Sequence, residues 1–298
     1  MTIALQAEHI AYGAFMRNRL LRIFPLFLFF FFVAISLQRD AFRAPDVLYV
    51  LFSNIGKPPT SEHFITGAAW TISVEFTVYL VFPFLARFVR AEGAAYLLRL
   101  IALMALVKLA AWGVSERSTH MFYSTLVGRF DQFLWGMLAA LMWQRHASVL
   151  QRHGRWLLVL ALAALWVATT VQARFASYFL PELRQAFWVF WGTAEALVWA
   201  GVVLAYLGAG IGWPKPLARL LEHGGAWSYS LYLWHGLVLF TLHRAVGSWM
   251  PFGSVAANAL LHFALALPLC LAVAWLSFLT IEQPFLRLRG RYTAPLAR

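Results

Sequence analysis

Long apolar runs are the feature that most restricts what this chain can fold into. Runs at residues 23–37, 156–171 and 186–211 approach or exceed the roughly 20 apolar residues that a helix needs to cross a bilayer. Hydrophobic residues make up 62% of the 298 residues and charged residues 12%, whereas a soluble domain has about 25% charged residues. The lipid bilayer is therefore the predicted surroundings of this chain, and no segment remains that is long enough for a soluble domain.

The apolar pattern predicts one membrane domain over residues 1–298, an all-α polytopic transmembrane helical bundle of about eight spans. Helices are expected because a helix satisfies its own backbone hydrogen bonds in lipid. A further apolar segment, residues 47–55, is too short to cross and is predicted to lie at the interface. The eight spans are predicted at residues 23–38, 69–89, 95–114, 125–143, 156–173, 186–210, 227–246 and 255–280.

The basic residues indicate an orientation rather than a nucleic-acid partner. The net charge is +12, but Lys and Arg stand at the ends of apolar runs and form no stripe with interleaved aromatic residues. With the N-terminus inside, most of the 24 Lys and Arg residues face the cytoplasm, as the positive-inside rule expects. We therefore predict a multi-pass protein of the plasma (inner) membrane with both termini cytoplasmic.

Cysteine and histidine usage gives little support for a metal. The single cysteine, Cys270, excludes a disulfide within the chain and any zinc site with several cysteines. The histidines show no His-x-x-x-His spacing of the kind that places two ligands on one helix face. We therefore expect no metal cofactor.

A few ionisable residues fall within the predicted spans, where each costs about 2.5 to 3.5 kcal/mol on insertion scales. Among them, Glu75 shares a helix face with Thr71 and Tyr79, four residues away on either side. Such a face can line a polar cleft, and a paired structural carboxylate is the alternative. Lys108 stands close enough to a span end to extend its amine to the interface, and Glu195 has no cation on its own helix, so structural roles are favoured for both.

Arg129 and Asp131 are two residues apart and point to nearly opposite sides of one predicted helix. They are therefore not expected to pair with each other, and each needs a partner from another helix. Salt bridges that hold the bundle together and direct catalysis are both open interpretations of this pair.

His235 shares a predicted helix face with Ser228, Leu231 and Tyr232. Ser228 lies two turns away, about 10 Å along the axis, which excludes a Ser–His nucleophile pair inside this helix. His235 is instead a candidate base or substrate donor, or a histidine satisfied in the core.

Three arginines, Arg17, Arg19 and Arg22, stand just before the first span. Membrane orientation and contact with lipid headgroups are sufficient to explain such a cluster.

Five segments in order resemble the membrane-bound acyltransferase 3 family: RNRLLRIFPL, AAWTISVEFTVYLVFPF, GRFDQFLWGMLAAL, SYSLYLWHGLVLF and WLSFLTIEQPF. Their order and spacing, over residues 15–285, make the resemblance specific. It implies transfer of an acyl group, often acetyl, from cytoplasmic acyl-CoA to a hydroxyl of a glycan, a lipid-linked sugar or a related cell-envelope molecule. Acyl-CoA is then the donor substrate.

The resemblance also implies site residues. Arg19 and Arg22 match the family's paired arginines and would bind the donor's phosphates, for which the guanidinium fork is suited. Glu75, Asp131 and His235 match the family's acidic and histidine positions and are the candidate catalytic residues.

The family usually begins with two further helices that carry a histidine thought to be catalytic, and no segment here matches them. This implies a chain with little activity by itself and leaves its general base unassigned. A transporter or flippase of a polar lipid or glycan, with Glu75, Arg129 and Asp131 along an intramembrane path, is the alternative function. Such proteins often show paired repeats and broken helices, which are not visible in this sequence. The oligomeric state is not predicted.

Overall fold

A computed structural model describes residues 10–37, 70–114, 118–175, 185–247 and 249–293. Helices account for nearly all of this part of the chain, which contains no β-strand apart from an isolated bridge between Ile10 and Thr293. The predicted all-α class is therefore confirmed. The predicted interfacial segment at residues 47–55 lies outside the described residues.

The helices follow the apolar runs closely. They are α2 (Tyr12–Leu37), α4 (Trp70–Glu92), α5 (Ala94–Val114), α6 (Ser118–Ser124), α7 (Leu126–Arg174), α8 (Phe187–Ala209), α9 (Lys215–Val246), α10 (Val255–Ser277), the π-helix η2 (Phe278–Glu282) and α11 (Gln283–Leu286).

Six helical stretches in the described part are long and apolar enough to cross a membrane: α2, α4, α5, α7, α8 and the continuous stretch Val255–Leu286. Their outer faces are suited to lipid, since Trp156 and Trp166 of α7 are 76% and 71% exposed. The chain is therefore a multi-pass membrane protein. The predicted span at residues 227–246 lies in α9, whose serine, tyrosine and histidine residues lower its mean hydropathy below that of the six.

Helix α7 carries two of the predicted spans in 49 residues. The segment between the two spans, residues 144–155, is also helical. The chain departs from helical geometry at His146, with φ −126° and ψ 24°, and bends there. The exposed residues around the bend include Arg145 and Gln151 and no proline, so the backbone can remain helical outside the apolar region.

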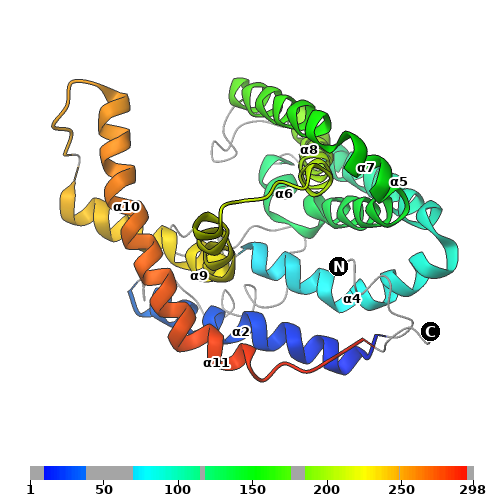
Figure 1. Cartoon of the computed structure of the whole chain (residues 1–298), viewed down its shortest axis with the longest axis horizontal. Helices are drawn as coiled ribbons and strands as arrows, with labels where there is room; N and C mark the ends of the chain where they lie inside the picture. The colour runs from blue at the N-terminus through cyan, green and yellow to red at the C-terminus, as the bar shows by residue number, and fades with distance from the viewer. Residues whose placement is uncertain (1–9, 38–69, 115–117, 176–184, 248, 294–298) are drawn as a thin grey trace.

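The helices form two groups with α4 between them (Figure 1). Helices α5, α6, α7 and α8 pack together on one side, while α2, α9, α10, η2 and α11 form the other side. One apolar cluster joins α2 to α4, α5 and α7 through Phe15, Phe82 and Leu134, and another joins α2 to α4 and α9 through Ile72 and Leu233. Helix α4 therefore contributes side chains to contacts with both groups.

Two glycines allow α7 to approach α8 closely beyond the bend. A Cβ atom added to Gly154 would lie 2.1 Å from the carbonyl carbon of Gly208, and one added to Gly208 would lie 2.4 Å from the Leu150 oxygen. Because backbone atoms form these contacts, no side-chain movement could make room for a larger residue. Small residues permit this close packing in membrane bundles generally.

The segment 287–293, here called the C-terminal strap, runs back along the start of α2. The Asn18 Nδ2 donates to the Gly290 carbonyl at 2.6 Å, and the Gly290 N–H donates to the Asn18 Oδ1 at 3.1 Å. The Ala11 N–H donates to the Tyr292 carbonyl at 2.9 Å. These bonds fix the strap beside the arginines of α2.

Candidate active site

Arg19 and Arg22 lie one turn apart on α2 and face polar groups of other helices. The Arg22 Nη1 lies 3.3 Å from the Glu282 Oε2, which joins α2 to η2. The Arg19 guanidinium carbon lies 4.9 Å from the centre of the Tyr79 ring and 5.0 Å from that of Phe15, within cation–π range. The Arg19 Nε is buried and has no hydrogen-bond partner among the described residues, so it remains available as a donor.

A third arginine, Arg289 of the C-terminal strap, interacts electrostatically with Arg19 and Arg22. It directly precedes Gly290, which Asn18 holds against α2. Burial lowers the pKa of the Arg289 guanidinium, and the positive charges of Arg22 and Arg19 lower that pKa further. Arg19, Arg22 and Arg289, here called the arginine cluster, therefore interact electrostatically although they come from two distant parts of the sequence.

Glu282 balances part of this charge and connects η2 to α9. Its side chain is 1% exposed. The hydroxyl of Ser230 donates to its Oε1, and the Ser277 hydroxyl lies 3.2 Å from the Ser230 oxygen. Sequence reasoning missed Glu282 and Arg289 as members of the site, although an acidic residue near the end of an apolar run was a visible signal for the first.

Glu75 lies on α4, and Arg22 and Arg19 are the cations whose charges act on it most strongly. It is half-buried. Within the described part of the chain it takes part in no hydrogen bond or ion pair, whereas the carboxylates of Asp131, Glu195 and Glu282 are all paired. Glu75 is thus a carboxylate close to the arginine cluster and free to accept a proton.

The polar face predicted on α4 is only partly used by the arginine cluster. Tyr79 receives the Arg19 guanidinium on its ring. Thr71, at the other end of this face, donates to the Tyr232 hydroxyl of α9 at 3.0 Å. The face therefore extends from the arginine cluster to α9, with Glu75 between its two ends.

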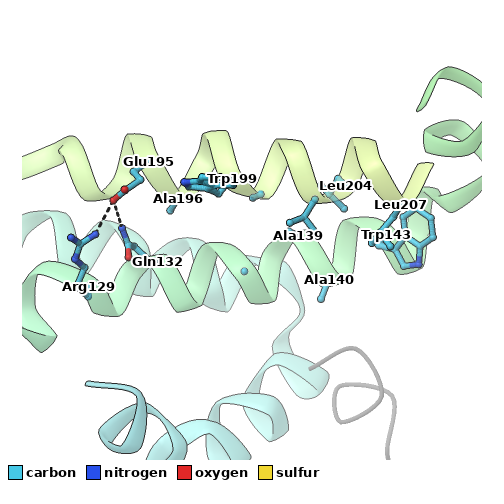
Figure 2. Close-up of a pocket in the computed structure, with 13 residues that line it drawn as sticks. Arg129, Gln132, Ala139, Ala140, Trp143, Glu195, Ala196, Trp199, Leu204 and Leu207 are labelled. Atoms are coloured by element: carbon cyan, nitrogen blue, oxygen red, sulfur yellow. Dashed lines mark hydrogen bonds and ion pairs between the residues drawn. The ribbon is translucent and has the colours of Figure 1, made fainter. Parts of the chain in front are cut away.

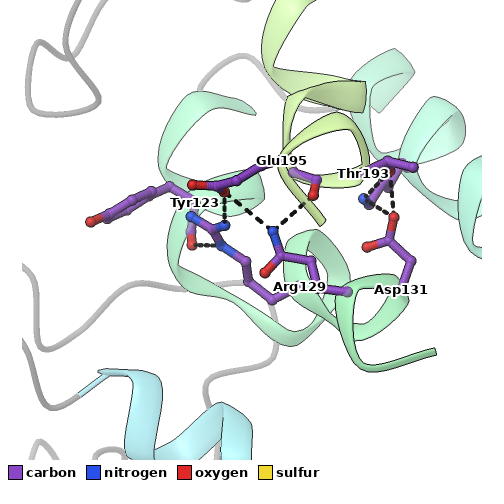
Figure 3. Close-up of polar contacts among 8 residues, drawn as sticks. Tyr123, Arg129, Asp131, Thr193 and Glu195 are labelled. Carbon is purple, nitrogen blue, oxygen red and sulfur yellow. Dashed lines mark hydrogen bonds and ion pairs between the residues drawn. The ribbon is translucent and has the colours of Figure 1, made fainter. Parts of the chain in front are cut away.

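A second ionic cluster joins α5, α7 and α8 (Figure 3). The Arg129 Nη1 lies 2.8 Å from the Glu195 Oε2 of α8, and the Arg129 Nε donates to the Tyr123 carbonyl at 2.6 Å. The Lys108 amine of α5 lies 2.8 Å from the Asp131 Oδ2. The prediction that Arg129 and Asp131 take partners from other helices is therefore confirmed.

Lys108 corrects an expectation from the sequence. It does not extend to the membrane interface, because its side chain is 1% exposed and it donates to both Asp131 and Thr193. The Thr193 hydroxyl in turn donates to Asp131 in a short hydrogen bond. A buried amine without these partners would carry a large desolvation cost, so the ion pair fixes its position. These contacts support the structural interpretation of Asp131.

His235 lies apart from both ionic clusters and faces a cavity of about 400 Å³ between α9 and α10 that Ser228, Tyr232 and Cys270 also line. Its Nδ1 lies 2.6 Å from the Tyr232 carbonyl oxygen. Nδ1 donates to that carbonyl, so Nε2 is the ring nitrogen that faces other partners. Ser228 donates instead to the Gly225 carbonyl at 2.8 Å, in agreement with the expectation that it does not pair with His235.

The structure thus brings Arg19, Arg22 and Glu75 together and places Asp131 and His235 elsewhere. The start of α4 links the two regions, since Trp70 lies beneath the Arg129 guanidinium at 5.6 Å and Thr71 contacts Tyr232. Among the described residues, no group of three His, Cys, Asp or Glu side chains could hold a metal ion.

The fold and these clusters define a multi-pass membrane protein with ionic groups paired between its helices. Residues 1–279 match the acyltransferase 3 model, described as an acyltransferase domain, and the chain belongs to that family. The family membership that the sequence motifs indicated is therefore confirmed.

The chain is 30% identical over 238 residues to Nodulation protein 10 of Rhizobium leguminosarum bv. viciae. The match covers 77% of this chain and 57% of that protein, so the chain spans little more than half of the relative's length. No solved structure matches the chain.

Proposed function

We propose that this protein transfers an acyl group, acetyl in the simplest case, from acyl-CoA to a hydroxyl of a glycan or related cell-envelope molecule. Membership of the acyltransferase family supports the reaction class. The observation that carries the donor assignment is the convergence of Arg19, Arg22 and Arg289 beside the carboxylate of Glu75, which is unpaired within the described part of the chain. The cations can bind the donor's phosphates, and the carboxylate can accept the proton of the acceptor hydroxyl.

The arginine cluster suits the phosphates of coenzyme A. Arg22 is already paired with Glu282, but the nearby Arg19 and Arg289 leave an excess of positive charge. Guanidinium groups bind phosphate oxygens through parallel, charge-assisted hydrogen bonds. Because α2 carries these arginines at its start, the positive-inside rule places the cluster at the cytoplasmic face of the plasma membrane, where acyl-CoA is present.

In the proposed reaction, the Glu75 carboxylate accepts the proton of the acceptor hydroxyl. The hydroxyl oxygen attacks the carbonyl carbon of the thioester and forms a tetrahedral intermediate. The carbon–sulfur bond then breaks, the acceptor retains the acyl group as an ester, and the coenzyme thiolate takes the proton from Glu75. Positioned proton transfer of this kind supplies about 10²- to 10⁴-fold in rate.

His235 is the second candidate for the base. Because its Nδ1 contacts the Tyr232 carbonyl, its Nε2 is the nitrogen that could accept a proton. Its cavity faces α10, and Glu75 is preferred because it lies nearer to the arginines that we assign to the donor. Asp131 is the least suitable of the three candidate bases, because Lys108 and Thr193 already donate to its carboxylate.

The test uses the protein in lipid nanodiscs with radiolabelled acetyl-CoA and an extract of cell-envelope glycolipids. Glu75→Gln should lower turnover by about 10²- to 10⁴-fold and leave the Kd for acetyl-CoA unchanged. Glu92→Gln is the matched control, because Glu92 lies on the same helix, is exposed and pairs with Arg99. Parental turnover in Glu75→Gln together with loss in His235→Gln would move the base to His235. Movement of a polar lipid across the membrane without release of coenzyme A would favour the transporter alternative instead.

A further inference from the structure

A cavity of about 730 Å³ lies between α7 and α8, outside the arginine cluster (Figure 2). Its size is in the range of sites that bind small ligands, about 300 to 1,000 Å³. Small residues create the space on both helices: Gly136, Ala139 and Ala140 of α7 and Ala196 and Ala200 of α8. A Cβ atom added to Gly136 would have no neighbour within 4 Å, so the space beside this glycine is open.

The cavity is long and mostly apolar. Arg129 and Gln132 line one end, and Trp143 and Leu207 line the other, as Figure 2 shows. Arg129 and Trp143 are 14 positions apart on α7, which corresponds to about 20 Å along a helix. A long, narrow, apolar space is suited to a linear hydrocarbon chain rather than to a compact polar molecule.

The polar end of the cavity carries balanced charge. Arg129 and Glu195 form an ion pair at 2.8 Å, and the Gln132 Nε2 donates to the Gly192 carbonyl at 2.8 Å and to Glu195 at 3.3 Å. The Glu195 side chain remains 30% exposed and can accept hydrogen bonds. Because Glu195 compensates Arg129, this end favours an uncharged, hydroxyl-bearing group over a phosphate.

The cavity is open to molecules that come from the bilayer. Its walls belong to two helices that are apolar enough to cross a membrane. Trp199 and Leu207, which line it from α8, are also 49% and 47% exposed on the lipid-facing side of the bundle. An apolar space with an exposed apolar rim, between two membrane-spanning helices, is a site that lipid chains can enter.

We propose that the cavity between α7 and α8 binds a membrane lipid with an uncharged, hydroxyl-bearing head group, such as a glycolipid. The hydrocarbon chain lies along Gly136, Ala140 and Ala200, and the head group hydrogen-bonds to Glu195 and Gln132. This binding does not depend on acyl transfer, so the two proposals can fail separately.

The test is photolabelling of the protein in nanodiscs with an alkyl glucoside that carries a diazirine on its chain, followed by mass-spectrometric mapping. Labels are expected on residues of the cavity. Gly136→Leu should lower labelling there at least fivefold, because its side chain fills the cavity. Gly201→Leu is the matched control, since Gly201 lies on α8 outside the cavity and also has open space for a side chain. Ala200→Trp with Ala194→Trp as its control repeats the comparison if either glycine variant fails to fold.

A second probe with the same chain but a phosphate head tests the charge argument. The parent protein should label less with this probe than with the glucoside. Glu195→Gln should reverse that preference, because Arg129 is then uncompensated. Equal labelling of the Gly136→Leu and Gly201→Leu proteins, uniform labelling of all lipid-facing surfaces, or a preference of the parent for the phosphate probe would each overturn the proposal.

Discussion

The Arg22 guanidinium lies 3.3 Å from the Glu282 carboxylate and joins helix α2 to the π-helix η2, 260 residues later in the chain. The two groups are unequally buried, with side chains 27% and 1% exposed. Ser230 holds the other carboxylate oxygen. The first turns of α2, the end of the α10 stretch and α9 therefore meet at one buried charge.

Loss of Arg22 should destabilise the protein through Glu282. Arg22→Ala leaves a buried carboxylate uncompensated, which costs about 3 kcal/mol, the lower end of the range for buried pairs because Arg22 is partly exposed. Thermal unfolding in detergent measures this loss. Arg22→Ala combined with Glu282→Gln should recover most of it, and a double variant as unstable as the single one would contradict the explanation.

Arg289 should contribute to donor binding although it lies in the C-terminal strap. Arg289→Ala is expected to weaken acetyl-CoA binding about tenfold, because it removes one charge-assisted hydrogen bond worth roughly 1.5 kcal/mol. Arg289→Lys should restore only part of the lost affinity. Isothermal titration in nanodiscs gives the Kd. Arg87→Ala removes an exposed cation of α4 and is the control for net charge. Equal affinity in the Arg289→Ala and Arg87→Ala proteins would remove Arg289 from the donor site.

Asp131 and Lys108 provide a test between a structural and a catalytic role. Asp131→Asn leaves the Lys108 amine buried without its counter-charge and should cost about 3 to 5 kcal/mol of stability. The double variant Asp131→Asn with Lys108→Met removes both charges and should regain stability. Activity that returns with stability supports the structural role. A stable but inactive double variant would assign Asp131 to catalysis.

The predicted orientation places the two ends of the span at residues 227–246 on opposite sides of the membrane. Single cysteines introduced at His223 and at Trp249, in a Cys270→Ala background, should react with a membrane-impermeant maleimide from the cytoplasmic and the outer side, respectively. The basic residues Lys215 and Arg219 near the first position are the physical reason. Reaction of both positions from the same side would contradict the eight-span topology.

Sequence alone was sufficient for the fold class, most helix positions and the family. A helix must satisfy its backbone in lipid, so apolar runs of sufficient length determine where helices lie. The absence of a close pair between Arg129 and Asp131 was also predictable, because helical geometry separates residues two positions apart. The same periodicity correctly grouped Ser228, Tyr232 and His235 on one face of α9.

Only the tertiary structure determined which charges meet. Lys108 was predicted to reach the interface, yet it is buried against Asp131 because α5 packs beside α7. Glu195 has no cation on its own helix, and its partner Arg129 comes from α7. Glu282 and Arg289 join the arginines of α2 only because the C-terminal strap returns to the start of the chain. A helical pattern specifies which face of a helix is polar, whereas the neighbour of that face depends on how distant segments pack.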